Sequence, residues 1–184
     1  MDEKVKKRKI NLYKYTPRTV SLQQMIPRLT GIYHDRGNIV ATDGHILCAI
    51  KSIYPPELER KIIGKRSEII DGKFPRWRCA IPKTMKSNLI DLDLDDLRER
   101  VEGGLAISKK TKQQVVIKIE TPGCDVYFEG VNFKLFLDFI SYYPDSKVYY
   151  SKANHPLKAS NKNGDLCIVM PIDMPIIEGF QLAV

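Results

Sequence analysis

The sequence contains no apolar run long enough to cross a membrane. The longest one, from Leu166 to Ile172, is far shorter than the roughly 18 residues that a membrane-spanning helix needs. The N-terminus, residues 1–4, is polar and lacks the apolar stretch of a signal peptide. We therefore expect a cytoplasmic protein with no membrane partner.

Cysteine and enzyme motifs are also scarce. The four cysteines, at positions 48, 79, 124 and 167, form no C-x-x-C pair and do not lie at metal-ligand spacing from any histidine. We predict reduced thiols in or near the core and no metal site. The sequence also lacks G-x-S-x-G, P-loop, G-x-G-x-x-G and H-E-x-x-H motifs, so no motif indicates a cofactor or one of these enzyme classes.

Positive charge is what the sequence has in excess. The 184 residues include 30 Lys and Arg against 22 Asp and Glu, a formal charge of +8, within an otherwise ordinary globular composition. Such an excess favours an acidic partner, but charge alone does not distinguish DNA from RNA. Residues 1–9 form a basic arm, which is attracted to polyanions, although a solubilising terminus is an equally common explanation. The arm contains Lys4, Lys6, Lys7, Arg8 and Lys9.

The pattern of apolar residues and turns predicts a strand, a helix and three further strands in the first part of the chain. After them, a short helix is expected at 57–63. Carboxylates followed by arginines favour a helix over 91–100, with two strand residues before a helical turn as the alternative. The first elements are a strand at 10–15, a helix at 20–29 with Leu22, Met25, Ile26 and Leu29 on one face, and strands at 32–34, 38–41 and 46–50, separated by turns at 35–37 and 43–44.

The last third of the chain repeats this order. Segment 44–50 parallels segment 164–170, since in both a glycine precedes an apolar strand. We interpret the repetition as an internal duplication that places the two closing strands side by side. The expected elements are strands at 115–119 and 125–128, a helix that begins at a capping Asn132 and ends near Tyr143, and strands at 147–150, 157–160 and 166–171.

Two acidic clusters invite a chemical interpretation. Asp43 and His45 suggest general acid–base catalysis, but an Asp-Gly pair between apolar strands is a strong hairpin signal, and no nucleophile lies nearby. The aspartates at 91, 93, 95 and 96 alternate with leucines and lack the glycine and closing acid of a calcium loop. We therefore expect a hairpin turn at the first cluster and a solvated face at the second.

The only tryptophan, Trp77, lies between Arg76 and Arg78. Aromatic and basic residues in this order suit phosphate contact and base stacking in single-stranded nucleic acid. The favoured explanation is a buried Trp77 with both arginines reaching solvent.

Three segments resemble, in the same chain order, motifs of the bacterial replicative sliding clamp, the beta subunit of DNA polymerase III. Segment 38–47, N-I-V-A-T-D-G-H-I-L, resembles the clamp signature V-A-T-D-G-H-R-L. Segment 71–82, D-G-K-F-P-R-W-R-C-A-I-P, resembles D-G-R-F-P-D-Y-R-R-V-L-P, which connects the second and third clamp domains. Segment 166–172, L-C-I-V-M-P-I, is similar to the C-terminal Y-V-V-M-P-M. Three matches in order are more specific than any one alone.

The resemblance implies an α+β, DNA-clamp (processivity-factor) fold, built from duplicated β-α-β-β-β units with antiparallel sheets, and a noncatalytic role in DNA replication. In the family, six such domains from two chains close a ring around duplex DNA. A family chain has three domains and is much longer than this one. We therefore predict one clamp-like domain over 10–172, with a first unit at 10–52, an insertion or connection at 53–110, a second unit at 111–172, and a C-terminal tail at 173–184.

The resemblance also implies two kinds of binding. In the family, a DNA polymerase or other clamp-binding protein inserts a short Gln-Leu-containing peptide into an apolar pocket, and duplex DNA is held through backbone electrostatics. The positions that match the pocket are Thr42, Gly44, His45, Leu47, Pro75, Ala80, Ile168, Met170 and Pro171. The candidate DNA contacts are Lys4, Lys6, Lys7, Arg8, Lys9, Arg28, Arg76, Arg78 and Lys134.

Departures from the family pattern bear on both kinds of binding. Ile46 stands where the family has arginine, Ala80 replaces a larger valine, and Ile172 replaces a methionine, so we expect a pocket that is reshaped or no longer used. One clamp domain cannot encircle a duplex, so a ring requires a homo-oligomer, and the alternative is a monomeric protein-interaction adaptor. The closing segment 179–184 contains a Gln-Leu pair and is a candidate occupant of the pocket in its own or a neighbouring subunit, with a final strand or a loose end as the alternative.

Overall fold

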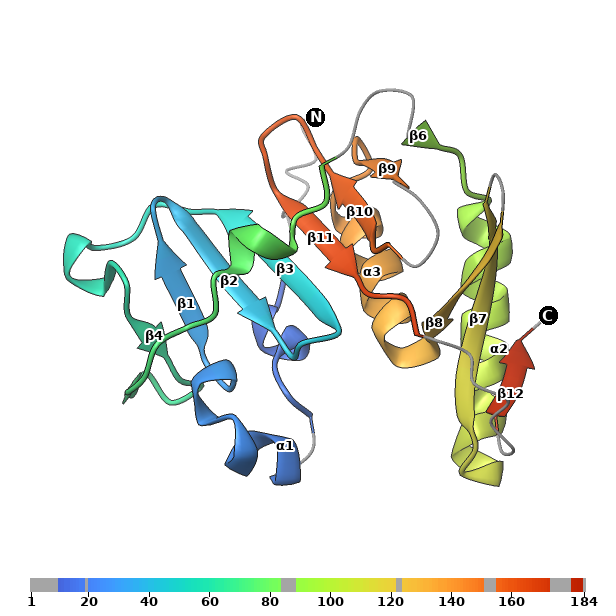
Figure 1. Cartoon of the computed structure of the whole chain (residues 1–184), viewed down its shortest axis with the longest axis horizontal. Coiled ribbons are helices and arrows are strands. Elements are labelled where there is room, and N and C mark those ends of the chain that lie inside the picture. Colours follow the sequence, from blue (N-terminus) through green and yellow to red (C-terminus); the bar gives the residue numbers. More distant parts are fainter. Residues whose placement is uncertain are drawn as a thin grey trace, which may run out of the picture.

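The computed structural model describes residues 10–18, 20–83, 89–121, 124–150, 155–172 and 180–183, which form two sheets (Figure 1). All strand pairs are antiparallel, as predicted, except that residues 180–183 pair in parallel with the strand at 114–121 in the smaller sheet. In spatial order, the nine-stranded sheet contains β5 (Ile69–Ile70), β4 (Ile62–Ile63), β1 (Ile32–Asp35), β2 (Asn38–Thr42), β3 (Ile46–Lys51), β11 (Leu166–Val169), β10 (Leu157–Ser160), β9 (Lys147–Tyr149) and β6 (Leu89–Ile90). The three-stranded sheet contains β12 (Phe180–Ala183), β7 (Gln114–Thr121) and β8 (Cys124–Glu129).

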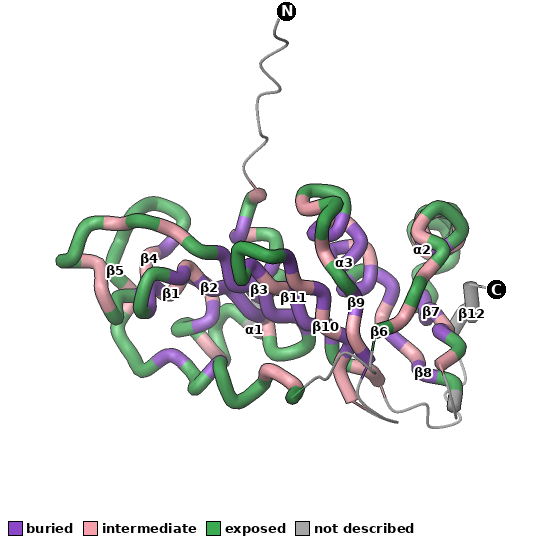
Figure 2. Tube along the Cα trace, turned by 90° about the horizontal axis from the view of Figure 1, so that it is seen from above, coloured by how far each residue is buried: buried purple, intermediate pink, exposed green. Residues whose placement is uncertain are grey.

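The helices lie on both sides of the larger sheet. The longest are α2 (Leu94–Thr111) and α3 (Gly130–Tyr142), and a shorter one is α1 (Val20–Met25). Figure 2 shows α3 above the larger sheet and α1 below it, whereas α2 lies over β7 of the smaller sheet and packs against β7 and β12. Helix α3 packs against β10 and β11 of one sheet and β7 and β8 of the other. Short 3₁₀ helices are η1 (Leu12–Tyr15), η2 (Pro27–Leu29), η3 (Pro56–Leu58) and η4 (Trp77–Ala80). Among the described residues, no helix combines the length and apolar character that a bilayer span requires.

The larger sheet has two similar halves that meet at one strand pair. Helix α1 precedes the meander β1–β2–β3, and α3 precedes the meander β9–β10–β11. The closing strands β3 and β11 pair with each other, with Leu47 opposite Ile168 and Cys48 opposite Cys167. The predicted side-by-side placement of these two segments is therefore confirmed.

Alternating residues of the central strands enter two separate cores. On β3, Ile46, Cys48 and Ile50 face a helix-side core that includes α3, while Leu47 and Ala49 face the opposite side. We call the second cluster the connection-side core, because the 71–83 connection supplies part of it. It consists of Leu29, Val40, Leu47, Ala49, Ile62, Phe74, Trp77 and Ile168. Because both faces are covered, β3 and β11 are apolar along nearly their whole length.

Two predicted elements are wrong. Residues 12–15 form η1 and not a strand, because the Asn11 side chain accepts a hydrogen bond from the Tyr13 amide and Leu12 and Tyr15, three positions apart, are both buried. The Tyr15 hydroxyl donates to the carbonyl of Leu135 at 3.0 Å. The helix expected at 57–63 is only η3, since Arg60 adopts a left-handed backbone with φ of 60° and the next residues pair with β1 as β4.

Other boundaries shift for local reasons. The helix expected at 20–29 is divided at Pro27, and Met25, placed on its apolar face, is 77% exposed. Glu129, not Asn132, caps α3, because its carboxylate accepts the Asn132 amide at 2.8 Å. Cys79 is exposed, against expectation, whereas Cys48 and Cys167 are buried free thiols as predicted. The remaining predicted strands are confirmed, and the helix expected over 91–100 is present but begins at Leu94, after the capping Asp93, and extends to Thr111.

Residues 53–110 contain two strands that extend one edge of the larger sheet, one strand at its other edge, and α2. The basic arm at 1–9 lies outside the described residues, as do residues 173–179 of the tail. Residues 180–183 form β12, so the alternative of a final strand is confirmed for this part of the tail.

Candidate functional site

Three segments far apart in sequence meet on the connection side of the larger sheet. The 71–83 connection crosses the face of the first-half strands (Figure 1). Phe74 and Trp77 of the connection share the connection-side core with Leu47 of β3 and Ile168 of β11. Directly after β11, the amide of Met170 donates to the carbonyl of His45 at 2.7 Å. These contacts bring together the segments that carry the predicted pocket residues.

The β2–β3 turn is shaped by Asp43. Its Oδ1 accepts the amides of His45 and Ile46, both at 2.9 Å, and Gly44 adopts a φ of 97°, which favours glycine. The Thr42 hydroxyl donates to the Ile46 carbonyl at 2.7 Å and accepts the Gly44 amide at 3.1 Å. The predicted hairpin is confirmed. Because the Asp43 carboxylate accepts hydrogen bonds that shape the turn, a structural role explains this residue without a catalytic one.

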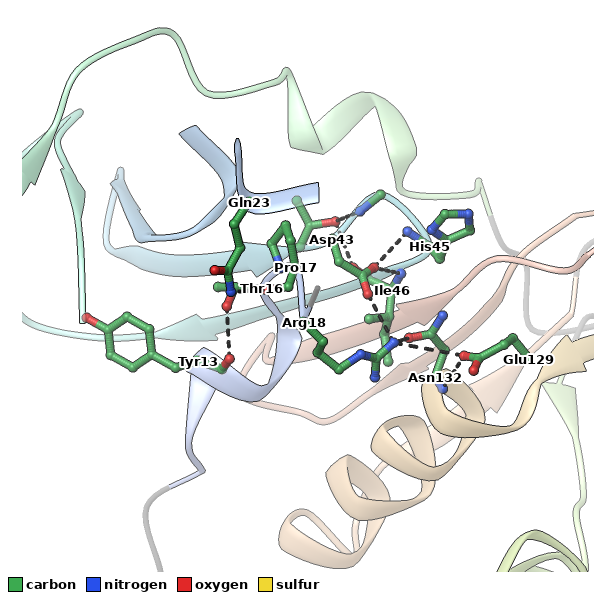
Figure 3. Close-up of polar contacts among 12 residues, drawn as sticks. Tyr13, Thr16, Pro17, Arg18, Gln23, Asp43, His45, Ile46, Glu129 and Asn132 are labelled. Atoms are coloured by element: carbon green, nitrogen blue, oxygen red, sulfur yellow. Dashed lines mark hydrogen bonds and ion pairs between the residues drawn. The ribbon is translucent and has the colours of Figure 1, made fainter. Parts of the chain in front are cut away.

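Arg18 connects this turn to the second half of the protein (Figure 3). Its Nη2 lies 3.3 Å from Asp43 Oδ2, 2.5 Å from Asn132 Oδ1 and 3.9 Å from Glu129 Oε2. The last two residues belong to the start of α3, so one guanidinium bridges both halves of the chain. Sequence analysis missed this residue, since its partners lie more than 20 positions away.

The predicted pocket residues divide into a floor and a rim. Leu47, Ile168 and Thr42 are buried, and we call them the floor; Leu47 and Ile168 share the connection-side core with Phe74 and Trp77. The rim is exposed or half-buried and consists of Gly44, His45, Pro75, Ala80, Met170 and Pro171. Met170 is the large apolar side chain of the rim and is 37% exposed. The rim thus offers exposed Met, Pro and His side chains beside a buried apolar core, and apolar side chains of this kind are typical of ligand-binding surfaces.

Ile46 does not contribute to this surface. It is 1% exposed and belongs to the helix-side core, on the opposite face of β3 from Leu47. Any effect of Ile46 on the predicted pocket is therefore indirect, because strand alternation directs its side chain away from the rim.

The connection is held to β1 by Asp35. Asp35 Oδ2 accepts a hydrogen bond from Trp77 Nε1 at 2.9 Å and a second one from Arg78, whose guanidinium also lies 4.2 Å from the centre of the Trp77 ring. Burial by itself raises the pKa of Asp35, but the hydrogen bonds from Arg78 and Trp77 outweigh it and lower the pKa below 3.8. Trp77 is 6% exposed, so the prediction of a buried tryptophan is confirmed, and base stacking on this ring is ruled out in this conformation.

The candidate DNA contacts lie on two faces. Arg28 and Arg76 are exposed on the connection side, where Arg78 is engaged by Asp35. Lys134 lies on α3 at the opposite side and pairs with Asp138 at 3.1 Å. The structure does not bring these residues into one basic patch. Lys4, Lys6, Lys7, Arg8 and Lys9 lie outside the described residues.

The aspartates at 93, 95 and 96 lie at the N-terminal end of α2 and stabilise it. Asp93 caps the helix by accepting the amides of Asp95 and Asp96, and these two pair with arginines one turn later. Over the described ranges, no group of three or more His, Cys, Asp or Glu could hold a metal ion. A cavity of about 550 Å³ lies between η1, α1 and the 64–68 turn and is lined by Tyr13, Arg18, Gln23 and Lys65 among others, but by none of the predicted pocket residues.

Comparison with solved structures identifies the fold. The chain is similar to the beta sliding clamp of Caulobacter crescentus, with 17% identity over 89% of this chain and 62% of that one and a TM-score of 0.66. It is also similar to the DnaN sliding clamp (DNA polymerase III subunit beta) of Bartonella birtlesii, with 19% identity over 89% and 63% of the two chains and a TM-score of 0.61. For the DNA polymerase III beta subunit of Thermotoga maritima, the identity is 16%, the coverage 88% and 61%, and the TM-score 0.58.

These matches confirm the predicted α+β sliding-clamp fold, since clamp structures match over most of the chain. The chain spans about three fifths of the length of the clamps it matches. No protein-family model matches the sequence, and no curated protein matches it either.

Proposed function

We propose that this chain, which has the fold of the bacterial sliding clamps, is a noncatalytic docking protein that acts on DNA. It binds partner peptides, such as the tail of a DNA polymerase or another clamp-binding protein, at the rim defined above. It associates with duplex DNA through backbone electrostatics and thereby serves as a processivity or docking factor. The observation that carries the proposal is the meeting of the β2–β3 turn, the connection and the end of β11 over a buried apolar floor.

The docking surface is tested with a labelled peptide that contains a Gln-Leu pair, of the kind that the resemblance implies. Met170→Ala removes the largest exposed apolar side chain of the rim and is expected to weaken binding by about 5- to 30-fold, equivalent to about 1–2 kcal/mol. Met25→Ala is the matched control, because Met25 is more exposed and lies on α1 outside the rim. Equal loss in both variants, or no binding by the wild type in fluorescence anisotropy, contradicts the proposal.

DNA association is tested with a labelled duplex at increasing salt. We expect the affinity to fall steeply with salt, since binding to phosphates releases counterions. The double variant Arg28→Gln, Arg76→Gln should reduce the slope of log K against log salt by about 1 for each of the two arginines that binds a phosphate in the wild type. Lys162→Gln, an exposed residue in the β10–β11 turn, is the control. Absence of duplex affinity at low salt removes DNA from the proposal and leaves the peptide-docking part.

The second candidate function is a monomeric adaptor that keeps the docking surface and forms no ring. The edges of the larger sheet favour it, since the 6-residue edge strand β8 belongs to the smaller sheet, whereas the described edge strands of the larger sheet, β5 and β6, have 2 residues each. Edge strands this short offer few backbone groups for pairing with another subunit. Analytical ultracentrifugation separates the candidates, since a ring requires several copies of this chain and an adaptor sediments as a 21.1 kDa monomer.

A further inference from the structure

Asp35 is not one of the residues of the proposed docking surface, but it holds the connection that carries two of them. It lies at the end of β1, outside the rim, and is a buried carboxylate with only 7% of its surface exposed. Its Oδ2 receives hydrogen bonds from two consecutive residues of the connection, Trp77 at 2.9 Å and Arg78. Hydrogen bonds to a charged acceptor are stronger than hydrogen bonds between neutral groups.

The connection has few other polar attachments. Its backbone hydrogen bonds are local, from Trp77 to Pro75, from Cys79 to Arg76 and from Ile81 to Arg78. Among hydrogen bonds between described residues, those that leave segment 71–83 for the rest of the protein end on Asp35.

Apolar contacts hold the start of the connection against the sheet. Phe74 stacks on Tyr33 with ring centres 4.6 Å apart and an angle of 10° between the planes, and Trp77 belongs to the connection-side core. The burial of Trp77 is itself non-directional, whereas the two hydrogen bonds to one carboxylate oxygen are directional and orient η4.

We propose that Asp35 is the positioning residue of the docking surface. By holding Trp77 and Arg78, it fixes the helical turn that carries Ala80 and the segment before it that carries Pro75. Both residues belong to the rim, so their distance from the His45 and Met170 side of the rim depends on this attachment. The inference rests on the proposed docking function and adds to it a residue that does not itself contact the peptide.

Trp77 provides a direct readout, because it is the only tryptophan in the chain. In Asp35→Ala, which removes both hydrogen bonds, we expect a red-shifted Trp77 emission and stronger quenching by acrylamide. In Asp35→Asn, the amide oxygen can still accept from Trp77 Nε1 while the charge that pairs with Arg78 is removed, so a smaller shift is expected. Asp71→Asn is the matched control, since Asp71 is an exposed carboxylate of the same connection.

The same variants are then titrated with the labelled Gln-Leu peptide. Asp35→Ala should lose about tenfold or more in affinity, Asp35→Asn less, and Asp71→Asn nothing, with unchanged far-UV circular dichroism in all three. A merely structural role for Asp35 would lower the melting temperature without changing the affinity of the folded protein. Arg78→Gln, which keeps Asp35 and the Trp77 hydrogen bond, replaces Asp35→Ala if that variant does not fold, and it should also weaken binding.

The possible results separate the inference from the function on which it rests. If the wild type binds no peptide, the docking function fails and the inference fails with it. If the wild type binds and Asp35→Ala binds equally well, only the inference is overturned. An unchanged Trp77 emission in Asp35→Ala also overturns the inference, because the connection is then held without the carboxylate.

Discussion

The strongest quantitative prediction concerns Asp165, which joins the two halves of the larger sheet. It lies in the turn between β10 and β11 and is 5% exposed. Its Oδ1 accepts the backbone amide of Lys51, at the end of β3, at 2.7 Å, and its Oδ2 accepts the Asn161 side-chain amide at 2.9 Å. The carboxylate therefore extends the β3–β11 pairing beyond its last backbone register position, Leu166 opposite Ala49.

Replacement of Asp165 by alanine leaves both donors without an acceptor. A hydrogen bond to a charged group contributes about 1.5–3 kcal/mol, and because the Lys51 amide is only partly buried we expect a total loss of about 3 kcal/mol. For a chain of this size, that corresponds to a decrease of roughly 6–12 °C in melting temperature. Asp165→Asn retains an oxygen that can accept the Lys51 amide and should lose only about 1 kcal/mol.

Urea denaturation and thermal melting followed by circular dichroism measure these changes. Asp145→Ala, an exposed carboxylate in the turn after α3, is the control and is expected to stay within about 0.5 kcal/mol of the wild type. If Asp165→Ala is no less stable than Asp145→Ala, the two hydrogen bonds do not hold the halves together, and the assignment is refuted.

Three further outcomes are expected. Gly130→Ala should destabilise the protein by about 1–3 kcal/mol in urea denaturation, since a Cβ there would lie 2.9 Å from Val115 Cβ. Gly103→Ala should instead stabilise α2 by up to about 1 kcal/mol, because a Cβ added there meets no other atom. The reverse order of stabilities would contradict the packing. Burial, aided by nearby acidic groups, raises the pKa of Tyr143 from 10.0 to about 12, so the folded state holds this proton more tightly than the unfolded state. The stability that the neutral Tyr143 contributes is complete below pH 10 and is lost as pH rises to 12. Tyr143→Phe should therefore lose less stability than the wild type over this range. Thermal melts at pH 9–12 that show no difference between the two proteins would disprove this linkage. The pKa of Asp35 is lowered below 3.8, so its contribution to folding stability is complete above that pH and is lost as pH falls through the folded-state pKa. The melting temperatures of wild type and Asp35→Asn should therefore converge in acid, and a difference that stays constant with pH would exclude this dependence on ionisation.

The strands around the proposed docking surface could be predicted from local patterns. Residues 46–50 and 166–169 are apolar runs bounded by glycine turns, and each is buried on both faces in the structure. The Asp43-Gly44 turn is equally local, since its hydrogen bonds join residues within four positions. The three clamp-like motifs indicated the fold that the structural comparison confirms. The residues of the proposed docking surface lie on these locally determined elements, so the sequence could nominate them, and their role in peptide binding stays a prediction.

Only the tertiary structure determined which distant side chains meet. The alternation of residues 10–15 resembles a strand, but Tyr15 is held by the carbonyl of Leu135, 120 positions away, and η1 results. In the same way, Arg18 reaches Asn132 across 114 positions, and Trp77 reaches Asp35 across 42. Apolar periodicity reports which face of an element is buried and says nothing about the partner of a charged or hydroxyl group. Such partners depend on the path of the whole chain, which is why the sequence alone predicted the strands, while the residues that join the two halves and hold the connection emerged only from the fold.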